Sequence, residues 1–134
     1  MPERLVVNVD GGARGNPGPA AVAAVVATPD GEVIERTGEL IGEATNNVAE
    51  YRAMLLGIER ARALGAREVE LIGDSELIVR QLRGEYKVKD RNLAELHRRA
   101  RAALAELERW SVRNVRREHN AEADRIVNET LDAG

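Results

Sequence analysis

The sequence predicts an α/β fold in which helices flank a mixed β-sheet. Three observations support this class. Short runs rich in Val, Ile and Ala, separated by turn residues, fill the first 41 positions. Longer segments with apolar residues every three or four positions begin after residue 46. Strands and helices then alternate in the second half of the chain, as in parallel pairing. A chain of 134 residues suits one domain, so we expect a single domain over 1–134.

The first three predicted strands form an antiparallel meander. The run LVVNV at 5–9 is rich in β-branched residues and is typical of a strand buried on both faces. Two further strands are expected at 20–28 and 31–41. Asp30 and Gly31 between them indicate a hairpin, because a two-residue turn at this place needs a positive φ.

The rest of the chain alternates helices with two more strands. A long helix is expected over 47–64, where Gly65 supplies a C-terminal cap. The later elements, in order, are a strand at 68–73, a short helix at 75–83 ended by Gly84, a helix over 93–107, a strand at 110–115 and a final helix at 121–131. His97, beside two arginines of the third helix, is expected at the surface.

Composition narrows the function classes. The absence of Cys excludes disulfides and thiolate chemistry, and two isolated His residues exclude a His-rich metal cluster. No run approaches the roughly 18 apolar residues of a membrane span, and no signal-peptide pattern is present, so we expect a cytoplasmic protein with no membrane partner. The net charge of −3 hides two basic stretches, at 80–101 and 109–117. Solvated surface or nucleic-acid contact would explain both stretches.

Four carboxylates stand at positions that this topology brings to one edge of the sheet. Asp10 lies at the end of the first predicted strand and Asp74 at the end of the fourth. These two strands reach the same edge of the sheet if they run parallel and adjacent. Glu50 and Asp124 lie in the first turns of two helices. Two like charges about 4 Å apart repel by roughly 4 kcal/mol at an effective dielectric of 20, so four in one cleft need a cation. Oxygen ligands suit Mg²⁺ or Mn²⁺, and carboxylates that bridge two such ions form a site for phosphoryl displacement.

Each of these carboxylates has a structural alternative when it is taken alone. The alternatives are a turn before two glycines for Asp10, a helix N-cap at Asp74 or Ser75, a capping box between Asn47 and Glu50, and a cap at Asn120 with Asp124 in the first turn. Taken together, four carboxylates at one sheet edge favour the metal site.

The same residues form four motifs in the order and spacing of a known family. DGGARGNPGPA begins at Asp10, TNNVAE ends at Glu50, DS occupies 74–75 and HNAEAD ends at Asp124. With these motifs the chain resembles type 1 ribonuclease H from about residue 4 to residue 131. The short connection at 84–90 resembles the compact branch that lacks an extra basic helix. The resemblance implies a ribonuclease H-like α/β fold, with a five-stranded mixed sheet of three antiparallel and then two parallel strands, and helices on both faces.

The resemblance also implies an activity and a site. It implies an endonuclease that cuts the RNA strand of RNA–DNA hybrids and leaves 5′-phosphate and 3′-hydroxyl ends. The catalytic residues, which would bind two Mg²⁺ or Mn²⁺ ions, are Asp10, Glu50, Asp74 and Asp124. The implied substrate contacts are Gly11, Gly12, Ala13, Asn16, Asn46, Asn47, Ser75 and Asn120. The glycine pair would let the backbone approach a ribose, because no Cβ intervenes. We expect a monomer, and double-stranded RNA stays open as a second substrate.

The histidine position departs from the family pattern. The family's catalytic histidine lies about ten residues before the final aspartate, whereas His119 lies five residues before Asp124. A loop residue is the favoured interpretation of His119, with a proton shuttle as the alternative. Arg116 and Arg117, just before it, are expected to contact phosphates.

Two other function classes fit parts of the sequence. A non-catalytic nucleic-acid-binding module would keep the fold, but it has no need of four carboxylates. A glycine-loop nucleotide binder is disfavoured, because no GxxxxGK[ST] motif is present and Pro17 and Pro19 prevent a helix from opening directly after the glycines.

Overall fold

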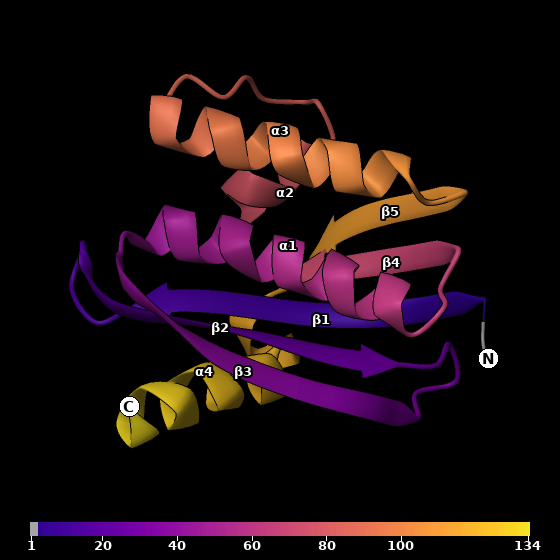
Figure 1. Cartoon of the computed structure of the whole chain (residues 1–134), viewed down its shortest axis with the longest axis horizontal. Coiled ribbons are helices and arrows are strands. Elements are labelled where there is room, and N and C mark those ends of the chain that lie inside the picture. Colours follow the sequence, from indigo (N-terminus) through magenta and orange to yellow (C-terminus); the bar gives the residue numbers. More distant parts are fainter. Residues whose placement is uncertain (1–2) are drawn as a thin grey trace.

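The computed structural model describes residues 3–134, which form a five-stranded sheet with helices on both faces (Figure 1). The strand order is β3-β2-β1-β4-β5. β1 pairs antiparallel with β2 and parallel with β4, and the predicted mixed sheet is therefore confirmed. The strands are β1 (Arg4–Ala13), β2 (Gly18–Ala27), β3 (Val33–Ala44), β4 (Glu68–Gly73) and β5 (Arg109–Asn114).

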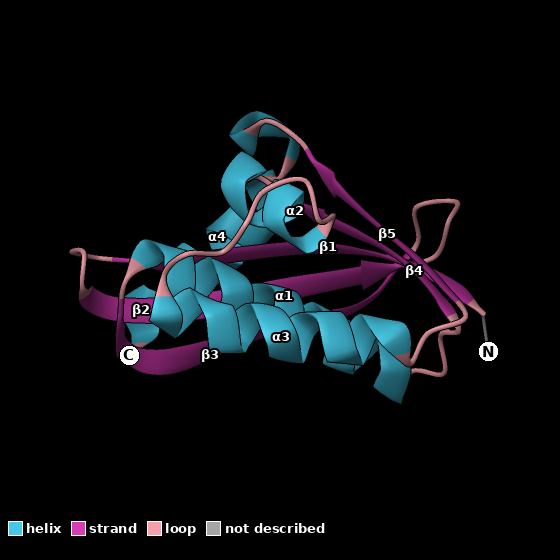
Figure 2. Cartoon of the chain, turned by 90° about the horizontal axis from the view of Figure 1, so that it is seen from above, coloured by secondary structure: helices cyan, strands magenta, loops and turns pink. Residues whose placement is uncertain are grey.

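The helices divide between the two faces of the sheet. α1 and α3 lie on one face and α4 lies on the other, as Figures 1 and 2 show from two directions. The elements are α1 (Asn46–Ala63), α2 (Glu76–Leu82), α3 (Arg91–Ala105), the short 3₁₀ helix η1 (Arg117–His119) and α4 (Ala121–Ala133). No helix in this part of the chain is long and apolar enough to cross a membrane.

β1 is fully buried on one face only. Leu5, Val7 and Val9 are buried in the main core, whereas Val6 and Asn8 on the opposite face are half-buried. The expectation of burial on both faces is therefore wrong. The 13-residue helix α4 covers only part of that face, and a hollow remains beside its N-terminus.

The hairpin between β2 and β3 is longer than predicted. Thr28 N donates to the carbonyl of Glu32, and Gly31 N donates to the carbonyl of Thr28. Among the described residues only glycines have a positive φ, so Gly31 (φ 96°) adopts it and Asp30 does not. A three-residue loop with a final left-handed residue fits this pattern better than the predicted two-residue turn.

Two side chains of α3 hold the C-terminal end of α2. The predicted surface position of His97 is wrong, because its ring is half-buried and its Nε2 lies 3.0 Å from the carbonyl oxygen of Gln81. Arg101 donates to the carbonyl of Leu82 at 2.6 Å. The last carbonyl groups of a helix lack partners within it, and here α3 supplies them. α2, which follows Asp74, is thereby anchored.

Candidate active site

Asp10 lies within β1, three residues before the strand ends at Ala13. The strand extends beyond the end predicted at Asp10, because residues 11–13 continue the antiparallel pairing, and Asp10 itself lies opposite Ala23. The parallel pairing with β4, in contrast, ends at Asn8. Asp10 therefore lies just beyond the last residue that pairs with β4, where side chains from other elements can approach it.

Asp74 follows β4 directly and precedes α2. Ser75, not Asp74, is the N-cap of α2, because its Oγ accepts a hydrogen bond of 3.4 Å from the amide of Ile78. The carboxylate of Asp74 is therefore not used as a cap. It accepts a hydrogen bond of 3.2 Å at Oδ2 from Nδ2 of Asn120.

Glu50 projects from the first two turns of α1 without a capping role. Thr45 is the N-cap, and its Oγ1 accepts a hydrogen bond of 3.2 Å from Val48 N. The capping-box alternative for Asn47 and Glu50 is therefore excluded. Oε2 of Glu50 is buried and has no hydrogen-bond partner among the described residues. An orphan carboxylate oxygen in a buried position is costly unless another group completes it.

The missing side chain of Gly11 lets α1 approach β1. A Cβ at Gly11 would overlap the carbonyl group of Ala49 and crowd the amide of Glu50. This close contact brings the start of α1, and with it Glu50, beside β1. Gly11 is buried by α1, so its lack of a Cβ serves the packing of this helix.

Asp10 is the centre of the acidic cluster. Burial, the charges of Asp74 and Asp124, a hydrogen-bonding contact with the Asp124 side chain and the charge of Glu50 together raise the pKa of Asp10 to about 8. Burial is the largest cause of this shift, and the neighbouring carboxylates add to it because like charges disfavour ionisation. The structure thus brings the four predicted carboxylates together from β1, α1, the β4–α2 junction and α4.

The pKa of Glu50 is shifted by neighbours that act in opposite directions. Burial raises the pKa of Glu50, a contact with Ser75 lowers it, Asp74 raises it and the charge of Arg117 lowers it. The net direction is upward. Arg117, at the start of η1, is therefore the cation whose field reaches the acidic cluster.

The donor set fits a hard divalent cation. Residues 3–134 contain no group of three or more His, Cys, Asp or Glu side chains that forms a ready-made ion shell. The fit rests on two features: Oε2 of Glu50 is buried without a hydrogen-bond partner among the described residues, and burial and neighbouring carboxylates raise the pKa of Asp10. A cation would relieve both features, and carboxylate oxygens are the ligands that Mg²⁺ and Mn²⁺ prefer.

Three predicted contact residues form a brace beside the cluster. Asn46 Oδ1 accepts a hydrogen bond of 2.9 Å from Ala13 N, and Asn16 Oδ1 accepts one of 3.1 Å from Asn46 N. These bonds tie the end of β1 and the following turn to the start of α1. Both asparagines are exposed, and each uses its side-chain carbonyl oxygen in one of these internal hydrogen bonds.

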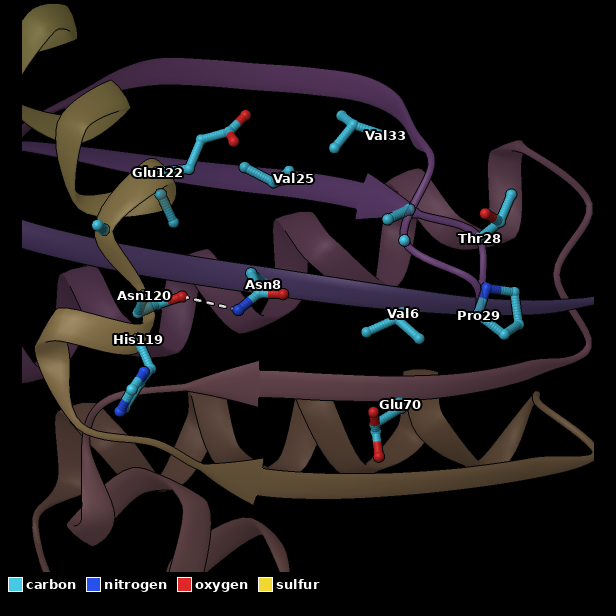
Figure 3. A pocket seen from close by; sticks show the side chains of 14 residues that line it. Val6, Asn8, Val25, Thr28, Pro29, Val33, Glu70, His119, Asn120 and Glu122 are labelled. Carbon is cyan, nitrogen blue, oxygen red and sulfur yellow. Dashed lines mark hydrogen bonds between the residues drawn. The ribbon is translucent and has the colours of Figure 1, made fainter.

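His119 and Asn120 both line the hollow beside α4, but they differ in exposure. His119 is exposed and lines the hollow beside α4, where Figure 3 shows it near Asn8. The acidic cluster lines another depression, with Asp10, Glu50 and Asp74. Asn120 stands at the N-cap position of α4 but makes no capping bond, and it is only 2% exposed. Its side chain is therefore a buried part of the site.

Asn8 is a polar residue of this region that the sequence analysis missed. Its Nδ2 donates a hydrogen bond of 3.0 Å to Oδ1 of Asn120, 112 positions away in the chain. The available signal was a polar residue inside an otherwise apolar strand, two positions before Asp10.

Comparison with known proteins identifies relatives. Residues 8–130 match the family described as "Reverse transcriptase-like". Ribonuclease HI of Halobacterium salinarum is 44% identical over 129 residues, which are 96% of this chain and 65% of that protein. A Mycobacterium tuberculosis protein described as bifunctional is 44% identical over 131 residues, 97% of this chain and 36% of that protein. The chain therefore spans less than two thirds of the length of these relatives.

Solved structures agree with the sequence matches. RNase H1 from Halobacterium salinarum has a TM-score of 0.96 at 42% identity, with 98% of this chain and 99% of that chain covered. LC11-RNase H1 in complex with an RNA/DNA hybrid has a TM-score of 0.92 at 40% identity, with 96% and 97% covered. Because these matches extend over nearly the whole of both chains, the chain belongs to the type 1 ribonuclease H family.

Proposed function

We propose that this protein is a divalent-metal-dependent endoribonuclease that hydrolyses the RNA strand of RNA–DNA hybrids and leaves 5′-phosphate and 3′-hydroxyl ends. The observation that carries this proposal is the environment of Asp10, which is half-buried among three other carboxylates. Perturbed titratable groups of this kind gather at functional sites. The hybrid bound to LC11-RNase H1 supports the substrate class.

The four carboxylates would hold the cations. They are Asp10, Glu50, Asp74 and Asp124, and each is fixed by a different element of the fold. Two divalent ions bound there would lower the pKa of an attacking water and stabilise negative charge on the leaving 3′ oxygen. The chain itself contributes the placement. The β1–α1 contact at Gly11 and the anchoring of α2 by α3 fix the carboxylates before substrate arrives.

The exposed brace next to the cluster is the proposed RNA-reading surface. The NH₂ groups of Asn16, Asn46 and Asn47 and the main chain at Gly12 and Ala13 can hydrogen-bond to ribose and base edges. A 2′-hydroxyl is both donor and acceptor, and its recognition separates RNA from DNA. The buried Gly11 and Asn120, and the capping Ser75, would support this surface rather than touch substrate.

Basic side chains are proposed to bind the phosphates. Several arginines in 80–101 are already engaged, because Arg80 and Arg83 pair with Glu85 and Arg98 pairs with Glu95. Several other cations of the two basic stretches make no salt bridge among the described residues, and of these we assign to phosphate contact Lys87, Lys89, Arg91, Arg99, Arg116 and Arg117. Each phosphate contact would steepen the fall of affinity with salt.

Cleavage of labelled duplexes tests the proposal. We expect RNA–DNA hybrid to be cut with Mg²⁺ or Mn²⁺ and to stay intact with EDTA, and end analysis to give 5′-phosphate and 3′-hydroxyl. DNA–DNA should stay intact, and RNA–RNA in the same gel decides whether double-stranded RNA is also a substrate. Binding of hybrid without any metal-dependent cleavage would instead support the non-catalytic binding module. We also propose a monomer, which light scattering after size-exclusion chromatography can check.

A further inference from the structure

Two asparagines link β1 to the catalytic edge on the side of α4. Figure 3 shows Asn8 and Asn120 pointing toward each other across the hollow, joined by a hydrogen bond. Asn120 Nδ2 also donates to the carbonyl of Val9 at 2.9 Å and to Oδ2 of Asp74 at 3.2 Å. A continuous path of hydrogen bonds therefore runs from Asn8 through Asn120 to Asp74.

The orientation of the Asn120 amide follows from its partners. The carbonyl oxygen of Val9 can only accept a hydrogen bond, so the NH₂ group of Asn120 must face it. Its second N–H then reaches Asp74, and its Oδ1 must face Asn8. Asn8 is consequently required as a donor. An acceptor at position 8 would oppose Oδ1, and a turned amide would place Oδ1 against both Val9 and Asp74.

We propose that Asn8 is a positioning residue for the cation-binding site, which acts through Asn120 to fix the carboxylate of Asp74. The proposal rests on the proposed function, in which Asp74 holds a divalent cation. Groups that orient a metal ligand typically change metal affinity or activity by about 10- to 100-fold when they are removed. Asn8 acts one hydrogen bond further from the ligand, so a smaller effect is expected.

Two substitutions test Asn8, and a third at Val6 is the control. Asn8→Leu removes the donor at similar size, and Asn8→Asp keeps the shape but offers only acceptors. Val6→Leu is the matched control, because Val6 lines the same hollow from the same face of β1 and has no polar group. For each variant we would measure the Mg²⁺ concentration that gives half-maximal cleavage, Mn²⁺ binding by electron paramagnetic resonance, and the Tm in EDTA.

We expect Asn8→Leu to weaken Mn²⁺ binding, and to raise the half-maximal Mg²⁺ concentration, by about threefold to tenfold. Asn8→Asp separates positioning from simple electrostatics. An added negative charge near the cluster would tighten cation binding, whereas a lost donor to Asn120 would weaken it. Weaker binding in Asn8→Asp, with Val6→Leu unchanged, supports the proposal. Unchanged binding in Asn8→Leu together with tighter binding in Asn8→Asp overturns it.

A double-mutant cycle tests the route. If Asn8 acts only through Asn120, Asn8→Leu has no further effect in an Asn120→Ala background. Additive effects would overturn the route. If Asn120→Ala does not fold, the direction in which Asn8→Asp changes Mn²⁺ binding decides the proposal by itself. If the wild-type protein neither cleaves hybrid nor binds Mn²⁺, the proposed function itself is refuted. If wild type and Asn8→Leu bind Mn²⁺ with the same affinity, only the positioning role of Asn8 is contradicted.

Discussion

The two ends of α1 hold carboxylates in opposite electrostatic settings. Near its C-terminal end, Arg60 binds Glu35 of β3 with two hydrogen bonds, of 2.5 and 2.9 Å. This guanidinium lowers the pKa of Glu35. Near its N-terminal end, Glu50 lies beside Asp10, whose neighbours are further carboxylates and whose pKa is raised to about 8. The same chemical group is thus neutralised at one end and left unneutralised at the other.

On the proposed function, this difference separates an acid with a structural role from the acids that would bind cations. Glu35 has its partner within the fold, so it has no need of a ligand. The cluster around Asp10 costs folding free energy at neutral pH unless a cation is added, because burial and the neighbouring carboxylates disfavour the ionised form of Asp10. Such a cost is expected where binding or catalysis requires it.

The largest expected effect is on cleavage. Asp10→Asn removes a proposed cation ligand at constant shape, and we expect hybrid cleavage to fall by at least about a thousandfold. The matched control Glu35→Gln makes the same chemical change at the paired end of α1, where cleavage should stay within about twofold. Initial rates on a labelled hybrid measure both. Comparable losses in the two variants would break the distinction drawn between the ends of α1.

The next effect concerns stability without metal. The folded-state pKa of Asp10 is raised above its unfolded value of 3.8, so the unfolded state binds fewer protons and stability falls as pH rises from about 4 to about 8. Asp10→Asn lacks this loss. We expect it to be more stable than wild type near pH 8, by a free energy of unfolding on the order of a few kcal/mol, with little difference near pH 4. Urea unfolding in EDTA across this pH range would show a constant difference if this were wrong.

Divalent cations should offset the greater stability of Asp10→Asn by stabilising the wild-type protein more than the variant. Ligand that binds only the folded state stabilises it by about 1.4 kcal/mol for each tenfold excess over its dissociation constant. We expect Mg²⁺ to raise the Tm of wild type clearly and that of Asp10→Asn much less, as scanning calorimetry would report. An equal rise in the two proteins would place the ion elsewhere.

The smallest expected effect is on stability, when the ion pair between Glu35 and Arg60 is removed. The pKa of Glu35 is lowered, so its stabilising contribution is present above its unfolded pKa of 4.5 and is lost as pH falls through its folded pKa. Because the pair is partly exposed, Glu35→Gln should lower the Tm by at most a few degrees. Added salt should reduce this difference. A change that is larger than this and insensitive to salt would indicate a packing role.

Much of the fold follows from local pattern. Apolar periodicity located the strands and helices, and Gly65 and Gly84 end α1 and α2 in the expected left-handed conformation, with φ of 93° and 83°. The turn type of the hairpin at 28–32 could not be predicted from the local pattern, because Asp and Gly suit several turn types. The pairing of Thr28 with Glu32 selects among them.

The site divides in the same way. The sequence by itself determined the four carboxylates and their convergence, because ordered motifs in a βββαβααβα pattern leave few topologies. Only the tertiary structure decided which polar groups are caps and which belong to the site: Thr45 and Ser75 cap, whereas Glu50, Asp74 and Asn120 do not. The physical reason is that a side-chain oxygen or amide takes whichever partner packing brings near. For Asn120 that partner is Asn8, at the far end of the chain.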